Sequence, residues 1–303
     1  MARTDVAATI DRIRRQLSSN YRHEVNRLSG NINSTATSLV LAEGITPNIR
    51  PGAMLNIGTE LMRVTAVNDS TDTVDVIREF FDSTAASHSA GDIVWVNSRF
   101  TGLDIFDALY DEISSYGPQL YRVVTAELDL SFTQDVVELP VSFIGCYGLV
   151  DVNRKWADPS PHSFSYAWPR ADVRLIRYDP TVWSEYPTSG IAIRLIDNSL
   201  PSKLIVRGAL PFNSAFGYND DLVTDVGLPE SMLDVVSMGV RLRLLTDNEA
   251  GVYGRTVQDE PRRTQETPPG AQVTTAQLNN ALYRNRKQEE INKLRALYPI
   301  RIS

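Results

Sequence analysis

The spacing of apolar residues changes several times along the chain, and each change marks an expected boundary. Near the N-terminus, apolar residues recur at intervals of three and four, at Val6, Ile10, Ile13, Leu17 and Tyr21. This period is typical of an amphipathic helix, and Gly30 is a common type of helix stop. We therefore predict a helical segment over residues 1–30, with Thr4 or Asp5 as its N-cap.

Between residues 36 and 99 the pattern changes to short, β-rich runs separated by Gly, Pro, Asn and Asp clusters. The runs are SLVLA, GAMLNIG, ELMRVTAV, DTVDVIREF and DIVWVN. The segment VNDSTDTV has turn residues between two alternating runs and predicts a hairpin. Five short strands in so few residues favour a small, closed or nearly closed β-barrel.

A helix is expected over residues 101–117, with Thr101 as N-cap and Asp104 three positions later. Residues 120–218 then contain six strand-like runs, YRVVTAELDLSF, DVVELP, FIGCYGLVDVNR, DVRLIRYD, GIAIRLI and SKLIVRGAL. Because no helix-period segment interrupts them, we predict an antiparallel β-sandwich and not a parallel sheet.

Helical periodicity returns in the last quarter of the sequence. Residues 228–248 predict a core helix, residues 249–272 are rich in Gly, Pro and charge and predict a linker, and residues 273–298 predict a final helix. The final helix has a narrow apolar stripe, formed by Leu278, Leu282, Ile291, Leu294 and Leu297. Such a helix either fits a groove on its own body or docks on a neighbouring chain.

The predicted fold class is therefore α+β and mainly β: a small β-barrel and a larger antiparallel β-sandwich, with helices between them and at both ends. A length of 303 residues with 42% hydrophobic content can support these cores. The single cysteine, Cys146, excludes an intramolecular disulfide, and we expect it to be a small buried side chain. No apolar run is long enough for a membrane helix.

Charge is distributed unevenly. Residues 1–28 carry six basic against three acidic residues, residues 255–303 carry nine against five, and residues 29–254 carry 15 against 29. An acidic body disfavours nucleic-acid binding over most of its surface. The basic ends either dock on an acidic partner or are solvated helices, and the sequence leaves both interpretations open.

Candidate chemistry is sparse. The sequence contains no GxxxxGK[ST], GxGxxG, HExxH or GxSxG motif, and its three histidines, His23, His88 and His162, lie in separate predicted elements. The acidic pairs at 220–221 and 289–290 do not have calcium-loop spacing. We therefore expect no catalytic residues, no metal, no cofactor and no enzymatic activity.

His88 lies in the run DSTAASHSAGDIVWV, between the predicted hairpin and the next strand. The order of Glu60-Leu-Met-Arg-Val, a turn, a strand, an Arg and this run resembles a module of tailed-phage neck and tail proteins. In that module an Arg-Gly pair precedes a GTxAAxH…GD loop, and the resemblance implies a structural histidine. Here Arg78-Glu79 stands in place of Arg-Gly. We predict that His88 pins the rim of the barrel.

The run LPESMLDVVSMGVRLRLL, the Pro-rich linker and the basic helix ending in RALYP resemble the C-terminal part of phage head-to-tail connector (adaptor) proteins. The resemblance implies a virion structural protein in the neck, assembled in the host cytoplasm. It also implies a cyclic homo-oligomer, commonly twelve-fold, that binds the portal and a downstream tail or stopper protein. Genomic DNA would pass through this ring without sequence-specific binding.

On this hypothesis the final helix supplies the partner interface. Its expected residues are Leu278, Leu282, Arg284, Arg286, Lys287, Ile291, Leu294 and Arg295. Two alternatives remain open. One is a tail-proximal, stopper or baseplate protein, because the barrel module recurs there. The other is a carbohydrate-binding adhesion module, suggested by Trp95, Trp156, Trp168 and Trp183 in or near the sandwich.

Overall fold

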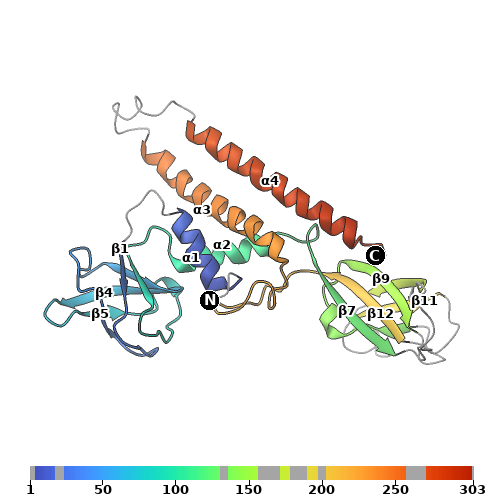
Figure 1. Cartoon of the computed structure of the whole chain (residues 1–303), viewed down its shortest axis with the longest axis horizontal. Coiled ribbons are helices and arrows are strands. Elements are labelled where there is room, and N and C mark those ends of the chain that lie inside the picture. Colours follow the sequence, from blue (N-terminus) through green and yellow to red (C-terminus); the bar gives the residue numbers. More distant parts are fainter. Residues whose placement is uncertain are drawn as a thin grey trace, which may run out of the picture. The chain divides into compact units, whose positions relative to one another are not determined.

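A computed structural model describes residues 4–17, 24–129, 136–155, 171–177, 190–196, 203–256 and 271–301 (Figure 1). The chain divides into two compact units. Unit 1 combines residues 1–113 with 214–284, and unit 2 combines residues 114–213 with 285–303. The predicted fold class is confirmed: twelve strands in antiparallel sheets are accompanied by four α-helices in the described residues.

The β part of unit 1 is one curled, six-stranded antiparallel sheet with the order β1-β6-β3-β4-β5-β2 (Figure 1). Its strands are β1 (Glu24–Arg27), β2 (Ser38–Val40), β3 (Met54–Ile57), β4 (Glu60–Asn68), β5 (Thr73–Ile77) and β6 (Ile93–Val96). Backbone bonds beside the two edge strands, from Ser29 N to Val40 O (2.9 Å) and from Ala42 N to Arg27 O (2.8 Å), bring the edges together. The predicted hairpin is formed by β4 and β5.

The prediction of one helix over residues 1–30 is wrong. Helix α1 (Val6–Leu17) ends at Leu17, and residues 24–27 form β1, which pairs with β6. The buried side chain of β1 is Asn26, which donates to Gly44 O at 2.8 Å and accepts from Glu43 N at 3.1 Å. A strand with a polar buried residue has no apolar alternation, so its period was hidden in the sequence.

Beside the sheet and α1, unit 1 contains helices α2 and α3 and the first part of α4. Helix α2 (Gly102–Ser114) begins with the predicted capping box, in which Thr101 N donates to Asp104 Oδ2 (3.0 Å) and Asp104 N donates to Thr101 Oγ1 (3.1 Å). Helix α3 (Leu233–Thr256) buries Val236 and Val240 and extends into the expected linker. Helix α4 (Ala271–Leu297) belongs to unit 1 up to Arg284 and to unit 2 from Asn285.

Unit 2 is a sandwich of two three-stranded antiparallel sheets, ordered β10-β11-β8 and β7-β12-β9. All six predicted strands are present: β7 (Arg122–Asp129), β8 (Val136–Glu138), β9 (Gly148–Lys155), β10 (Val173–Arg177), β11 (Ile191–Leu195) and β12 (Lys203–Leu210). Both sheets contribute to one apolar core. Cys146 lies in this core as a free thiol, as predicted, and burial raises its pKa.

A buried arginine joins α1 to the sheet and to α2 within unit 1. The Arg14 guanidinium lies 4.9 Å from the centre of the Trp95 ring, and its Nη2 donates to Gly58 O at 3.4 Å. Gly102, the first residue of α2, packs directly on the same carbonyl. A Cβ at position 102 would lie 1.8 Å from Gly58 O and 2.5 Å from Arg14 Nη2. The contact therefore requires glycine, because a Cβ would overlap the backbone carbonyl of Gly58.

We predict that Gly102→Ala lowers the free energy of unfolding by about 1–3 kcal/mol, because the added methyl overpacks a closed contact. Urea unfolding followed by circular dichroism measures the change. Gly30→Ala is the matched control, since a Cβ there meets nothing within 4 Å. Equal stability of the two variants would contradict the inference that Gly102 packs too closely on Gly58 O to accept a methyl group.

Candidate interaction surfaces

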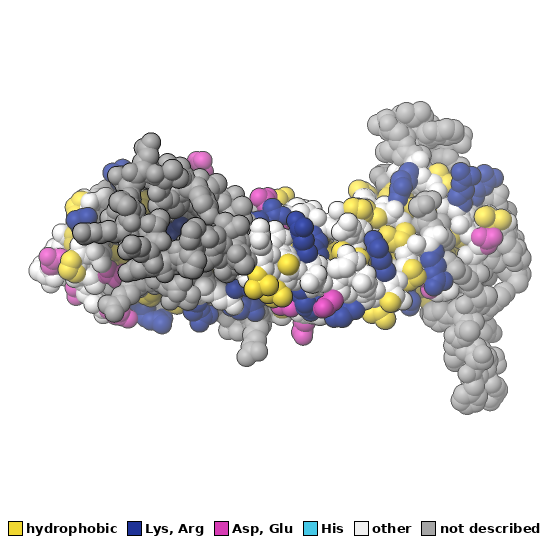
Figure 2. Space-filling model, turned by 90° about the horizontal axis from the view of Figure 1, so that it is seen from above, with side chains coloured by type: hydrophobic (Ala, Val, Ile, Leu, Met, Phe, Trp, Pro, Cys, Tyr) yellow, Lys and Arg dark blue, Asp and Glu magenta, His cyan; other side chains and the backbone are white. Residues whose placement is uncertain are grey.

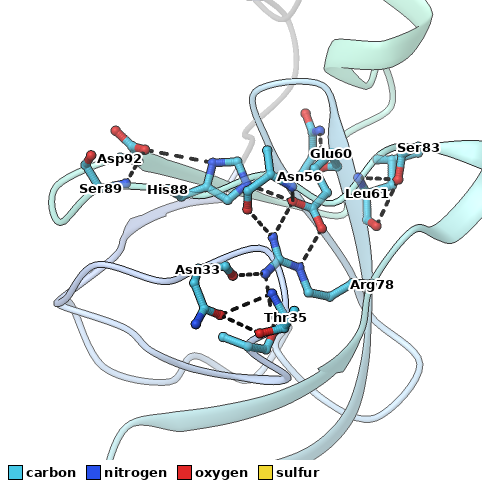
Figure 3. Close-up of polar contacts among 12 residues, drawn as sticks. Asn33, Thr35, Asn56, Glu60, Leu61, Arg78, Ser83, His88, Ser89 and Asp92 are labelled. Atoms are coloured by element: carbon cyan, nitrogen blue, oxygen red, sulfur yellow. Dashed lines mark hydrogen bonds and ion pairs between the residues drawn. The ribbon is translucent and has the colours of Figure 1, made fainter.

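A buried carboxylate organises one rim of the curled sheet (Figure 3). Glu60, the first residue of β4, is 1% exposed. Its two oxygens accept from Arg78 Nε at 2.7 Å and from Arg78 Nη2 at 2.6 Å. This two-bond geometry is the strongest form of a carboxylate–guanidinium pair. It fixes the start of β4 against the residue that follows β5.

His88 is tied to the same carboxylate. Its Nε2 lies 2.8 Å from Glu60 Oε2, and its backbone exchanges two 2.9 Å hydrogen bonds with Ile32. Arg78 also donates to the carbonyls of Asn33, Ala36 and Ala86, so it binds the two loops that meet at this rim. This geometry agrees with the prediction that His88 pins the rim.

The residue after Arg78 has a backbone conformation that is unusual for a non-glycine residue. Glu79 has φ 58° and ψ 34°, the left-handed conformation that glycine adopts most easily. A glutamate therefore stands at a position whose conformation favours glycine. The loop that follows holds two more left-handed residues, Phe81 and Asp82.

The hydrogen bonds at the rim change the acidity of Glu60. Burial by itself would raise its pKa, but the bonds from His88, Arg78 and the Ala86 amide lower the pKa from 4.5 to about 2. The carboxylate is therefore charged in the folded chain at any pH above that value.

The eight interface residues predicted on α4 fall into two groups. Leu278 and Leu282, in unit 1, are 59% and 52% exposed. Arg284 and Arg295 are also exposed, and apolar and basic side chains lie next to one another along the exposed face of α4 (Figure 2). Within the described part of the first half, residues 277–284, the exposed side chains include Leu278, Leu282 and Arg284.

The second half of α4 packs on the sandwich of unit 2. Ile291 is 3% exposed, and Leu294 packs against Tyr121, Val150 and Ala209. Tyr121 Oη donates to Tyr298 O at 2.6 Å, which secures the end of the helix. The prediction that Ile291 contacts a partner is therefore wrong, because its own chain already covers it.

Two basic residues of the predicted rim also have partners within unit 2. Arg286 Nη1 lies 2.6 Å from Glu290 Oε1, and Lys287 Nζ lies 4.9 Å from the centre of the Tyr116 ring. Leu278, Leu282 and Arg284 therefore remain as the exposed part of the predicted interface that belongs to unit 1.

A groove of about 740 Å³ in unit 1 was not predicted. Its floor contains Glu112 of α2, which accepts from Arg243 Nε of α3 at 2.7 Å and from the Tyr283 hydroxyl of α4. Gly239 allows this approach, since a Cβ there would lie 2.2 Å from Glu112 Oε1. Asp104, Asp107 and Asp111 line the same groove. Their spacing of three and four in the sequence was the available signal.

The acidic lining affects its own ionisation. Burial raises the pKa of Asp107, and the like charges of Asp104 and Asp111 raise it further.

Within the described ranges, no group of three or more His, Cys, Asp or Glu side chains is arranged to hold a metal ion. Among the described helices, none combines the length and apolarity that crossing a membrane requires.

Trp95, the described tryptophan among the four considered for sugar binding, does not offer an open ring face. Trp95 is 8% exposed, and the Arg14 guanidinium covers its ring. Trp156, Trp168 and Trp183, like His23 and His162, lie outside the described residues.

Comparison with protein-family models and with curated proteins found no match to this chain.

We predict that Glu60 makes stability depend on pH. Its folded pKa of about 2 lies below its ordinary value of 4.5, so its contribution is complete above pH 4.5 and is lost as the pH falls towards 2. A difference of this size corresponds to roughly 3 kcal/mol.

Urea unfolding at about pH 6 and about pH 3 measures this loss, with Glu60→Gln as the comparison. The wild type should lose more stability than Glu60→Gln between the two conditions, because only the wild type has a carboxylate to protonate. Parallel losses in both proteins would show that Glu60 is not the source.

Proposed function

We propose that this chain is a structural protein of the tailed-phage neck, a head-to-tail adaptor that forms a ring between portal and tail. In this role it has no catalytic activity and needs no cofactor. It assembles in the host cytoplasm and remains in the virion. The ring is a cyclic homo-oligomer, twelve-fold on the resemblance, and it meets the portal on one side and a tail or stopper protein on the other.

The exposed half of α4 is the observation that carries the proposal. Leu278 and Leu282 stand one helical turn apart and are more than half exposed. Arg284 beside them is exposed, and the sequence from Ala271 to Gln288 contains no acidic residue. Aliphatic side chains with arginines at their rim have the composition of a protein interface. A docking helix of this kind is what the resemblance to adaptor proteins implies.

The charge distribution supports a DNA conduit. Residues 29–254 carry 29 acidic against 15 basic residues, and three aspartates line the groove of unit 1. Phosphates held by lysines and arginines bind tightly through counterion release, so a wall poor in cations lets DNA slide. Passage of the genome therefore needs no base contacts from this protein.

A tail-proximal, stopper or baseplate protein is the second candidate, because the segment that forms the curled sheet resembles a module that recurs in such proteins. The two roles differ in what they require of α4. An adaptor needs the helix to assemble on the portal, whereas a tail protein tolerates a polar substitution on it. The carbohydrate-binding alternative loses Trp95 as a platform residue.

We predict that Leu282→Asp prevents ring assembly and leaves both units folded, because the substitution places a charge on the apolar docking face. Light scattering measures the mass of the chain alone and after mixing with the portal protein of the same phage. The wild type should form a ring with the portal, and Leu282→Asp should remain monomeric.

Leu297→Asp is the matched control, since Leu297 is an exposed leucine near the end of the same helix. Circular dichroism and thermal unfolding of both variants verify that they fold. A ring that forms equally with Leu282→Asp would exclude the adaptor role of this surface and favour the tail-side alternative.

A further inference from the structure

A second exposed apolar feature of unit 1 lies in the loop after β5. Phe80–Asp82 form a tight turn whose backbone is not helical at Phe81, and Phe81 is 71% exposed. Phe81 and Asp82 have φ values of 52° and 59°, and Glu79 before them has 58°. Non-glycine residues seldom adopt this conformation, and a bulky aromatic residue there is an outlier. Strain of this kind occurs at functional sites, where the surrounding structure imposes it.

Buried contacts on both sides of the turn impose it here. Arg78, immediately before Glu79, is held by the Glu60 carboxylate at 2.6–2.7 Å (Figure 3). After the turn, buried Ser83 accepts from Leu61 N at 3.0 Å and donates to Leu61 O at 3.3 Å. The turn is therefore fixed at both ends to the first two residues of β4.

The aromatic rings are also positioned. Phe80 and Phe81 pack edge to face with their centres 4.6 Å apart, and the Arg63 guanidinium lies 5.8 Å from the centre of the Phe80 ring. The result is a projecting aromatic side chain on a backbone that is already ordered. Binding through such a group loses little conformational entropy, which is a property of interface hot spots.

Charge indicates the chemistry of the complementary surface. Two exposed carboxylates, Glu79 and Asp82, flank Phe81, and Arg63 is the cation on the Phe80 side. A partner surface should therefore be apolar at its centre and basic at its rim. The exposed part of α4 has this composition, with Leu278 and Leu282 at the centre and Arg284 beside them.

We propose that the Phe80–Phe81 turn of one copy docks on the Leu278–Leu282 face of α4 in a second copy, with Asp82 near Arg284. This inference rests on the proposed ring and names the partner of its docking helix as the adjacent subunit. Both surfaces belong to unit 1. Because two different patches meet, the contact is head-to-tail, and such contacts form a ring when the rotation between neighbours closes.

Disulfide trapping between separately made variants tests the contact. Phe81→Cys chains mixed with Leu282→Cys chains should give a mixed disulfide dimer under mild oxidation, and neither variant alone should do so. The native thiol, Cys146, is buried and stays in place. Phe81→Cys mixed with Leu297→Cys is the control, because residue 297 is more exposed than residue 282 and lies outside the proposed face.

A charge exchange tests the rim of the same contact. Asp82→Lys and Arg284→Glu should each weaken self-association, because each places like charges together. The chain that carries both substitutions restores an opposite pair at every contact, so its assembly should return. Sedimentation velocity measures the oligomer population of each protein.

The outcomes separate this contact from the adaptor role. No mixed disulfide, or unchanged assembly of Phe81→Ser, would overturn the loop contact. If the ring on the portal still required Leu282, the adaptor role would stand, with α4 meeting the portal itself. A specific mixed disulfide in a chain that ignores the portal would support the contact between copies and reject the adaptor role.

Discussion

The requirement that a buried charge be fully hydrogen-bonded shapes the sheet of unit 1. The Glu60 carboxylate accepts four bonds, from Arg78, His88 and the Ala86 amide, and Arg78 uses its remaining donors on three carbonyls. An ion pair removed from water is tolerated only when its other hydrogen-bonding positions are satisfied. Satisfying them places the loops around residues 33, 36, 86 and 88 beside the start of β4. The hydrogen bonds of the buried ion pair therefore determine the arrangement of the rim, whereas the interior of the sheet is apolar.

The sequence was sufficient where periodicity and local chemistry agree. The six sandwich strands, the β4–β5 hairpin and the Thr101–Asp104 capping box follow from alternation, turn residues and cap spacing. It was insufficient where the buried side chain is polar, as at Asn26 in β1. The Glu60 network had the same obstacle, because its members are 18 and 28 positions apart and only the fold brings them together.

Helix α4 illustrates a different limit. Its stripe of leucine and isoleucine predicts contacts, but a stripe does not say which of them lie within the chain. The structure divides it: Ile291 and Leu294 cover the sandwich of unit 2, and Leu278 and Leu282 face outward from unit 1. The groove over Glu112 was missed because it needs three helices and the absence of a side chain at Gly239.

The discontinuity of unit 1 has a consequence for synthesis on the ribosome. Helix α1 buries its apolar face within a unit that residues 214–284 complete, and Thr4 bonds Asp221, 217 positions later. At ordinary elongation rates, roughly 10–40 s separate the emergence of α1 from that of its partners. During this time the whole sandwich is made, and it can fold first. The part of α1 that packs on α3 therefore stays uncovered during this time, even after the sheet and α2 have emerged.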